Sequence, residues 1–282
     1  MQQPEYLIYN GVLQQAGQGF ISPDYRGFKF GDGLFETMKL VNGELALKQF
    51  HFERLFASML QLGFVVPDFF TPSYLDSLVK QLAVANGHWQ HARVRVTVFR
   101  GEGGLYGVVD HLPHTIIQTW EQPPATGLNE HGLVVGIFRD AVKAADRFSS
   151  IKSSNYQCYA LAAMWANEQQ LDDALLLNAW GRVADATIAN VFVVHEGVVK
   201  TPPLDEGGIN GVMRRYLLAA IRGEGRQVQE VPVTEEILAE ASELFLTNAL
   251  SGIRWVKSLG NNTYQRHLST LLYNQSINAR LW

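Results

Sequence analysis

Short runs of alternating hydrophobic and polar residues open the chain, and such alternation is typical of strands with one wet face. The runs cover residues 6–9, 28–30 and 34–41. Asn10-Gly11 and Asn42-Gly43 follow the first and third runs, and this dipeptide accepts the positive φ angles of tight hairpin turns. The start of the chain is therefore predicted to be rich in strands.

From residue 49 the apolar residues recur at spacings of three and four, which is the period of an amphipathic helix. Similar patterns predict further helices at 73–85, 155–169, 211–222, 235–241 and 264–279. Strands are expected at 92–99, 114–120, 133–138, 174–178, 191–195, 198–200 and 243–247. Because both halves mix strands and helices, the predicted fold class is α/β (α+β), without an internal repeat.

Two consecutive prolines, Pro123 and Pro124, interrupt both helix and strand hydrogen bonding and mark the predicted domain boundary. A chain of 282 residues is expected to form two domains, at roughly 150 residues each. We predict an N-terminal domain at 1–120, an interdomain linker at 121–127 and a C-terminal domain at 128–282.

The composition argues against several classes of protein. Hydrophobic residues make up 47% of the chain and the net charge is −4 without a run of either sign, so neither nucleic acid nor a membrane surface is an expected partner. Cys158 is the only cysteine and the histidines form no ligand group, so no disulfide and no metal site are expected. Because no leader pattern and no stretch of about 20 apolar residues is present, we expect a cytoplasmic protein.

A glycine-rich turn, Gly-Gly-Ile-Asn-Gly over residues 207–211, stands directly before the apolar-periodic run at 212–221. Free amide groups at the start of a helix favour an anion, commonly a phosphate. The alternative is an ordinary glycine turn in which Asn210 caps the helix.

Three charged residues each allow a chemical and a structural interpretation. Lys152, among serines before a predicted helix, either forms a Schiff base in a confined site or remains a solvated loop residue. Asp185, in a nearly neutral apolar stretch, either has a cationic or protonated partner or closes a turn by bonding its own backbone. Arg54, on the first long helix, either grips an oxyanion or forms a surface ion pair.

Taken in order, these segments resemble the fold-type IV pyridoxal-phosphate enzymes, the class IV aminotransferase family. This family includes branched-chain and D-amino-acid aminotransferases and aminodeoxychorismate lyases. The resemblance covers nearly the whole chain. It rests on motifs at 30–37 (FGDGLFET), 51–55 (HFERL), 151–155 (IKSSN), 185–192 (DATIANVF), 201–214 and 246–250 (LTNAL). It implies a two-domain enzyme with a smaller N-terminal α/β domain, a larger C-terminal α/β pseudo-barrel domain and a homodimeric assembly.

The resemblance also implies roles for the matching residues. Lys152 would hold pyridoxal 5′-phosphate covalently, and Asp185 would keep its pyridine nitrogen protonated. The groups implied to bind the phosphate are Arg54, the backbone amides of Ile209 and Asn210, and the segment with Asn248 and Ala249. Asp185 stands where the family normally has glutamate, so either the strand lies closer to the ring, a water bridges the gap, or the nitrogen is less firmly protonated.

Within the family, the motifs at 208–214 and 247–250 most resemble the aminodeoxychorismate lyases, because many aminotransferases have threonine at the position of Asn210. The implied reaction releases pyruvate from a small-molecule amine substrate, 4-amino-4-deoxychorismate, and leaves 4-aminobenzoate. Thr37 matches a threonine of the lyases and would assist the leaving group, or else it only packs against the sheet. An arginine that some lyases have near Leu105 is missing.

Two other activities remain open at this stage. One is transamination of branched-chain or D-amino acids, although the Arg-x-His carboxylate trap of the D-amino-acid enzymes is absent after Arg100-Gly101. The other is a homologue that binds the cofactor but lost turnover through the change at Asp185.

Overall fold

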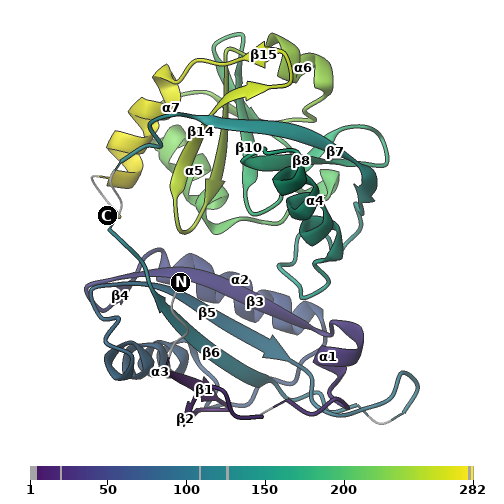
Figure 1. The fold of residues 1–282 in the computed structure, drawn as a ribbon, viewed down its shortest axis with the longest axis vertical. Helices are drawn as coiled ribbons and strands as arrows, with labels where there is room; N and C mark the ends of the chain where they lie inside the picture. The colour runs from purple at the N-terminus through teal and green to yellow at the C-terminus, as the bar shows by residue number, and fades with distance from the viewer. Residues whose placement is uncertain (1–4, 20, 108, 125–126, 279–280, 282) are drawn as a thin grey trace. The chain divides into compact units, whose positions relative to one another are not determined.

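The computed structural model describes residues 5–19, 21–107, 109–124, 127–278 and 281, and it divides into two compact units (Figure 1). Unit 1 comprises residues up to 124 together with 152–155, and unit 2 comprises 125–151 and 156–282. The segment 152–155, which the sequence division assigned to the second domain, therefore groups with unit 1. Residues 125 and 126 of the predicted linker and residue 279 of the last predicted helix lie outside the described residues.

In its described residues, unit 1 contains a six-stranded antiparallel sheet with the strand order β2-β1-β6-β5-β3-β4. The strands are β1 (Tyr6–Tyr9), β2 (Val12–Gln15), β3 (Gly33–Val41), β4 (Glu44–Leu45), β5 (His91–Phe99) and β6 (His114–Glu121). Its helices are α1 (Arg26–Phe30), α2 (Lys48–Gln61) and α3 (Pro72–Ala85).

Both predicted hairpins are confirmed. Asn10 and Gly11 have φ angles of 47° and 81° and connect β1 to β2, with Tyr9 opposite Val12. Asn42 and Gly43 have φ angles of 48° and 78° and connect β3 to β4. These positive angles are those that Asn-Gly tolerates better than other dipeptides.

The two long helices cover one face of the unit 1 sheet. Glu36, Val96 and Ile117 are neighbours across β3, β5 and β6 and share this face, and Glu36 bonds side chains of α2. Asn86, which ends α3, donates to Thr119 of β6 on the same face. The opposite face carries the alternating residues that include Phe35 and Thr37.

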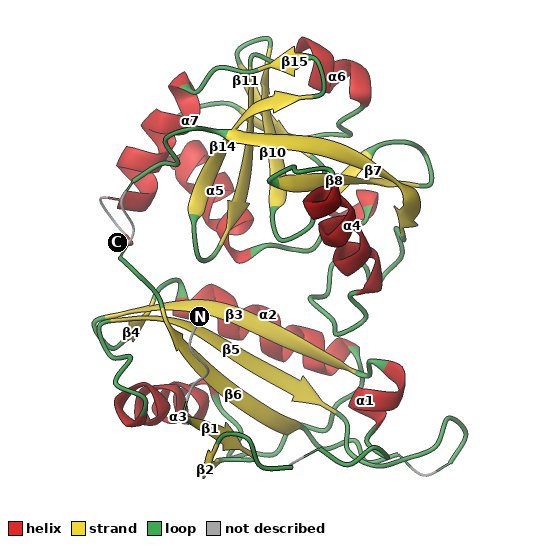
Figure 2. Ribbon diagram, in the orientation of Figure 1, coloured by secondary structure: helices red, strands yellow, loops and turns green. Residues whose placement is uncertain are grey.

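In its described residues, unit 2 contains a nine-stranded mixed sheet that curls into a half-barrel (Figure 2). The strands are β7 (Leu133–Lys143), β8 (Asp173–Asn178), β9 (Val183–Ala186), β10 (Asn190–His195), β11 (Val198–Thr201), β12 (Val228–Glu230), β13 (Glu243–Asn248), β14 (Gly252–Leu259) and β15 (Asn262–Thr263). The helices are α4 (Gln157–Glu168), α5 (Val212–Gly223), α6 (Glu235–Glu240) and α7 (His267–Leu272), together with the 3₁₀ turn η1 (Leu204–Glu206) and the π-helical segment η2 (Tyr273–Asn278). The mixture of helices and strands confirms the predicted α/β (α+β) class.

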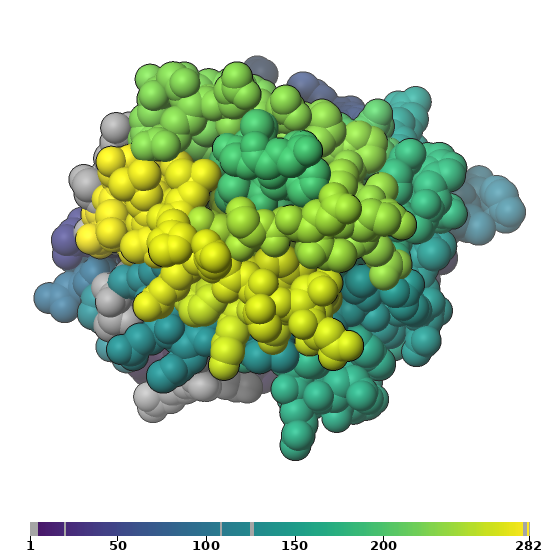
Figure 3. All heavy atoms as spheres, turned by 90° about the horizontal axis from the view of Figure 1, so that it is seen from above, coloured from purple at the N-terminus to yellow at the C-terminus, as the bar shows by residue number. Residues whose placement is uncertain are grey.

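Two packed regions stabilise unit 2. One lies between strands of the curled sheet and includes Val191, Leu244 and Val256, and the other lies where α4 covers β7 and β8. The C-terminal segment, yellow in Figure 3, lies beside light-green atoms of the chain, and the Tyr216 hydroxyl of α5 donates to the Ser276 carbonyl at 2.7 Å. The C-terminal turn is thereby tied to α5.

Two predicted elements differ in the structure. Residues 28–30, predicted as a strand, belong to helix α1, which ends at Gly31 with a left-handed φ of 63°. A run of three residues is too short for its period to separate strand from helix, and glycine in this conformation is a common helix end. The last predicted helix begins only at His267, because Tyr264 donates its amide to Lys257 of β14. No described helix has both the length and the apolar character needed to cross a membrane.

Candidate functional site

Lys152 is held against the start of β3 in unit 1. The amide of Phe35 donates to the Lys152 carbonyl at 3.0 Å, and the amide of Ser154 donates to the Gly33 carbonyl at 2.8 Å. The half-buried side chain places Nζ 4.7 Å from the centroid of the Phe35 ring. Backbone hydrogen bonds on both sides of Lys152 therefore fix its backbone, whereas the predicted covalent role of its amine stays a prediction.

Two more basic side chains lie on the same face of the sheet as Phe35. The Arg95 guanidinium carbon lies 3.8 Å from the Phe35 ring centroid, and Arg95 Nε donates to Thr97 at 3.2 Å. Lys39 is buried, and burial lowers its pKa to about 8. Arg95 lies opposite Thr37 in the register of β3 and β5. This face therefore carries further cations, and one of them, Arg95, contacts the same Phe35 ring as Lys152, which suits an anionic ligand group.

Arg54 lies on α2 and points to the helix-covered face of the sheet. Its Nε and Nη2 donate to the two Glu36 oxygens at 2.7 and 2.6 Å, and His51 Nδ1 lies 2.6 Å from Glu36 Oε2. Glu36, His51 and Arg54 are all buried. The interpretation of Arg54 as a surface ion pair is therefore wrong, whereas its predicted role in phosphate binding stays a prediction.

The charges of this cluster govern its titration. Burial raises the pKa of Glu36, but the charges and hydrogen bonds of Arg54 and His51 outweigh burial and lower this pKa to about 2. Burial lowers the pKa of His51, and the charges of Arg54 and Lys152 lower it further. The charge and hydrogen bond of Glu36 raise this pKa but do not outweigh burial. The charge of Lys152 therefore reaches the cluster that positions Arg54.

Thr37 is half-buried on the same sheet face as Phe35, opposite Arg95. This location agrees both with packing on the sheet and with a hydroxyl that contacts a ligand near Lys152. Its predicted part in catalysis stays a prediction.

Asp185 is the centre of the second group of predicted residues, in unit 2. It lies on β9 with 2% of its surface exposed. Tyr159 donates to Oδ2 at 3.2 Å, the Ile209 amide donates to Oδ2 at 2.9 Å and Asn190 donates to Oδ1 at 3.0 Å. These donors come from three other segments, so the interpretation of Asp185 as a turn-closing residue is wrong. They stabilise its negative charge.

A partly buried cation lies near this carboxylate. Lys143 Nζ lies 5.6 Å from the Tyr159 ring centroid. Burial lowers the pKa of Lys143, although the charge of Asp185 raises it. The pKa of Tyr159 lies well above its usual value because of burial and the neighbouring Asp185. The surroundings of Asp185 thus combine a carboxylate with a phenol that stays protonated.

The glycine-rich turn leads into α5, as predicted, but its cap differs. Gly211 is the N-cap residue and provides no side-chain cap, so the interpretation with Asn210 as the cap is wrong. The Ile209 amide donates to Asp185, and the Asn210 amide donates to the Ser150 carbonyl at 3.0 Å. Each of these two amides would have to exchange its present acceptor in order to bind a phosphate.

The end of β13 is the last predicted part of the site. Asn248 Oδ1 accepts from the amides of Leu250 and Ser251 at 3.0 and 2.8 Å, which shapes the turn that includes Ala249. Thr247, the residue before, is opposite Asn190 in the register of β10 and β13. Unit 2 therefore connects Asp185, the 209–210 turn and the end of β13 through Asn190, which also donates to the Ile209 carbonyl at 2.7 Å.

The structure adds partners that the sequence analysis missed. Glu36 belongs to the motif at 30–37 and Tyr159 to a predicted helix, but the sequence pattern assigns neither residue a role in the site. The alternation of residues 92–99 did place Arg95 on one strand face, but it gave no reason to connect it with Lys152. Among the described residues, no cluster of three or more His, Cys, Asp or Glu side chains could hold a metal ion.

Comparison with known proteins gives consistent results. A family model described as amino-transferase class IV matches residues 33–259. A protein of Methanocaldococcus jannaschii, provisionally named a branched-chain-amino-acid aminotransferase, is 30% identical over 250 residues, which cover 88% of this chain and 85% of that protein. The aminodeoxychorismate lyase of Vibrio harveyi is 30% identical over 239 residues, covering 83% and 85%.

A solved structure shares the fold. The branched-chain aminotransferase of Thermoproteus uzoniensis, crystallised with norvaline, superposes with a TM-score of 0.84 at 23% identity, covering 95% of this chain and 91% of that one. At this identity the likeness describes the fold alone.

Proposed function

Because the chain belongs to the class IV aminotransferase family, we propose that it is a 4-amino-4-deoxychorismate lyase that releases pyruvate and leaves 4-aminobenzoate for folate biosynthesis. The family is pyridoxal-phosphate-dependent, and pyridoxal 5′-phosphate is the cofactor of this chain. What the chain itself must supply is an amine for the aldehyde, an acid for the ring nitrogen and donors for the phosphate.

The residues present fit this cofactor. Lys152 supplies an amine on a hydrogen-bonded backbone, and Asp185 supplies a buried carboxylate. Helix α5 begins without a side-chain cap, so its first amides are suited to an anion. The turn before it is also confined, since a Cβ on Gly208 would meet the Ala184 carbonyl oxygen and one on Gly211 would meet Asn190 Oδ1.

We assign the roles as follows. Lys152 holds the cofactor covalently and Asp185 pairs with the ring nitrogen. The phosphate would be bound by Arg54, the amides of Ile209 and Asn210, and the segment with Asn248 and Ala249. Arg54, Ile209 and Asn210 would then give up their present acceptors, which are Glu36, Asp185 and the Ser150 carbonyl. When bound, the protonated pyridine ring stabilises negative charge that develops on the substrate carbon next to the amine.

The main support for the role of Asp185 is that three groups donate hydrogen bonds to its carboxylate. Tyr159, Asn190 and Ile209 hold the carboxylate in one orientation and stabilise its charge. An anionic Asp185 can keep a proton on the ring nitrogen, as the glutamate of the family does. Both Asp185 oxygens already accept hydrogen bonds, so the ring proton would share an oxygen with one of these donors.

Lys152 and Thr37 carry the proton transfers of the lyase reaction. Acting as a general base, the Lys152 amine would remove the proton from the ring carbon that bears the substrate amine. The Thr37 hydroxyl donates to the ether oxygen of the departing enolpyruvyl group, which leaves as pyruvate. The aromatic product makes this step favourable.

The choice of the lyase rests on sequence. Asn210, in the motif at 208–214, resembles the lyases more than those aminotransferases that have threonine, and the Vibrio harveyi lyase is 30% identical. The relative from Methanocaldococcus jannaschii favours branched-chain transamination as the second candidate. In that reaction Lys152 would return the proton to the cofactor, and a keto acid would leave.

Two parallel assays of the holoenzyme separate these candidates. One contains 4-amino-4-deoxychorismate alone, and the other contains a branched-chain or D-amino acid with 2-oxoglutarate. Pyruvate release in the first assay without any amino-group acceptor supports the lyase. Glutamate formation in the second, with no pyruvate in the first, refutes it. Lys152→Ala is the control for both.

We also propose a cytoplasmic homodimer. Phe28, Leu105 and Tyr106 of unit 1 are 72%, 61% and 98% exposed, and a second copy would remove such side chains from water. Light scattering of the purified holoenzyme should give twice the chain mass of 31.5 kDa. A mass of one chain would refute the dimer.

A further inference from the structure

Arg93 lies on the face of the unit 1 sheet that is opposite to helices α2 and α3. In the register of β5 it is directly opposite Lys39 of β3 and Trp120 of β6, and Arg95 follows two positions later on the same strand. Residues two positions apart on a strand share a face and lie about 7 Å apart. Lys39, Arg93 and Arg95 are therefore neighbouring cations on one face.

The central strands supply no acid to this face. Along β3, β5 and β6, the residues that share the face with Arg93 are all neutral or basic. Like charges at directly opposite positions destabilise a sheet, and Lys39 and Arg93 form such a pair. An anionic ligand group near them would offset this repulsion.

The guanidinium group of Arg93 is held over an aromatic ring and keeps accessible donors. Its Cζ lies 5.1 Å from the Trp120 ring centroid. No hydrogen-bond or ion-pair partner of this side chain is found in the part of the chain that the structure describes. Only Nε is buried in this unpartnered state, so Nη1 and Nη2 keep surface that a ligand can reach. The planar fork of a guanidinium matches the two oxygens of a carboxylate.

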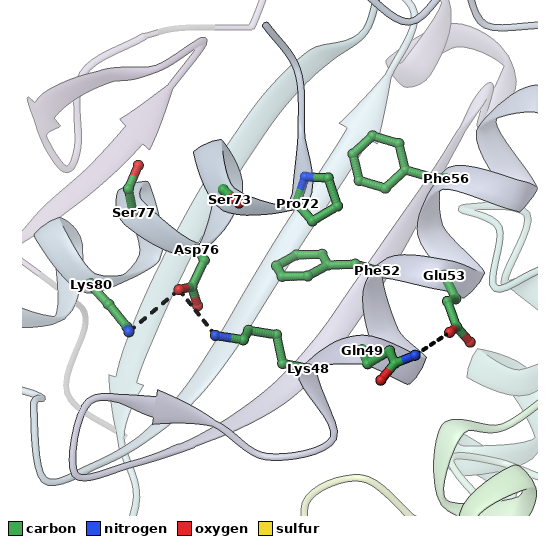
Figure 4. Close-up of a pocket in the computed structure, with 10 residues that line it drawn as sticks. All are labelled: Lys48, Gln49, Phe52, Glu53, Phe56, Pro72, Ser73, Asp76, Ser77 and Lys80. Carbon is green, nitrogen blue, oxygen red and sulfur yellow. Dashed lines mark hydrogen bonds and ion pairs between the residues drawn. The ribbon is translucent and has the colours of Figure 1, made fainter.

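The lysines of α2 and α3 already have carboxylate partners. In Figure 4, dashed lines join Lys48 and Lys80 to Asp76, at 3.3 and 3.4 Å. Lys80 also pairs with Glu44 at 2.6 Å. Arg93 differs from these cations, because a ligand can supply the carboxylate that it lacks among the described residues.

Arg93 belongs to the same sheet face as the proposed catalytic amine. Lys152 Nζ and Arg95 Cζ lie 4.7 and 3.8 Å from the centroid of the Phe35 ring. Arg95 is thus the nearer arginine to this ring, and Arg93 follows one step further along the face of β5. A substrate whose amine lies at Lys152 therefore meets Arg95 first and Arg93 next.

The same guanidinium disfavours an apolar substrate side chain. Arg93 is half-buried, and an apolar group at this place would remove water from Nη1 and Nη2 without replacing the hydrogen bonds. Covering a charged donor in this way is costly. The face therefore favours a second anionic group over a branched hydrocarbon.

We propose that Arg93 determines the substrate class by binding a second carboxylate, so that the site takes a cyclic amine with two carboxylates in preference to an amine with an apolar side chain. Arg95 binds the carboxylate nearer to the amine, and Arg93 binds the farther one through Nη1 and Nη2. Trp120 holds the Arg93 guanidinium in place by stacking. The inference rests on the proposed function, because it takes Lys152 as the position of the substrate amine.

The probe is 3-(carboxymethoxy)benzoate, titrated calorimetrically into the holoenzyme. This diacid has a ring carboxylate and an ether-linked carboxylate but no amine, so it cannot form an imine. The comparison ligand, 3-ethoxybenzoate, has the same ring and ether but lacks the second carboxylate. The diacid is expected to bind with a Kd on the order of 1 mM, and the monoacid at least about tenfold more weakly, because its charged hydrogen bonds to Arg93 are missing.

Two variants of Arg93 locate the second carboxylate. Arg93→Gln should raise the Kd of the diacid about tenfold and leave the Kd of 3-ethoxybenzoate unchanged, which also shows that the variant is folded. Arg93→Lys keeps the charge without the planar fork and should bind the diacid with intermediate affinity. Lys80→Gln is the matched control, because Lys80 already pairs with Asp76 and Glu44, and it should bind both ligands as the wild type does.

The outcomes are distinct. Tighter binding of the diacid that is lost in Arg93→Gln but kept in Lys80→Gln supports the proposal. Equal binding of the two acids to the wild type, a preference that Arg93→Gln retains, or no binding of the diacid at about 20 mM overturns it.

Failure of the proposed function gives a different result. A preference for the diacid that depends on Arg93, without pyruvate release from 4-amino-4-deoxychorismate, supports the carboxylate site and refutes the lyase. Pyruvate release without any preference for the diacid overturns the role of Arg93 alone.

Discussion

Replacing Glu36 with glutamine removes the negative charge that holds Arg54 and His51 in the buried face of unit 1. Glu36 is 1% exposed and receives two hydrogen bonds from Arg54. Its pKa is lowered from 4.5 to about 2, and these 2.5 pH units correspond to about 3 kcal/mol of stability at pH 7. Glutamine imitates the protonated acid, so Glu36→Gln should lose this amount.

The same reasoning fixes the pH dependence. Because the folded-state pKa lies below the unfolded one, the stabilisation is complete above about pH 5 and is lost as the pH falls towards 2. The difference between wild type and Glu36→Gln should therefore shrink from about 3 kcal/mol at pH 7 to about 2 kcal/mol at pH 3.5.

Urea unfolding of both proteins, followed by circular dichroism, measures these differences. Glu44→Gln is the matched control, because Glu44 pairs with Lys80 at an exposed site and its loss should change the free energy of unfolding little. Equal stability of wild type and Glu36→Gln at pH 7, or a difference that grows as the pH falls, would refute the reasoning.

Further predictions follow from the other contacts. Asp185→Asn should lower the turnover of the folded protein by about a hundredfold, whereas Asp185→Glu should retain activity; equal rates for Asp185→Asn and wild type would contradict the role of the acid. Asn190→Ala should cost about 1–3 kcal/mol in urea unfolding, because Asp185 Oδ1 and the Ile209 carbonyl each lose the hydrogen bond from Asn190; an unchanged midpoint would contradict this. Arg95→Ala should raise KM about tenfold with a smaller change in kcat, and a change in kcat alone would contradict a binding role for Arg95.

The features that sequence predicts well are those set by near neighbours. The hairpins at Asn10-Gly11 and Asn42-Gly43 follow from the φ angles that two adjacent residues accept. Helix α2 is predicted because apolar residues recur at helical spacing over several turns. Residues 28–30 offered no such repetition, and their helix depends on the left-handed Gly31 that ends it.

The partners within the site depend on distant residues, which local patterns do not determine. Asp185 was recognised as an acid that needed a partner, but its donor Tyr159 lies 26 positions earlier and Ile209 lies 24 positions later. Arg54 was recognised as a candidate, but not its pairing with Glu36, 18 positions earlier. Likewise, the hydrogen bonds that join residues 152–155 to β3 form across more than 100 positions of sequence.

Borohydride reduction of the holoenzyme, followed by mass spectrometry of its peptides, tests the central claim most directly. The reductant fixes the cofactor to the amine that holds it, and we predict a single phosphopyridoxyl group on Lys152. Lys39 and Lys143 are the chemical competitors, because burial lowers the pKa of each amine. Modification at either of them with Lys152 unmodified, or full turnover in Lys152→Ala, would contradict the account.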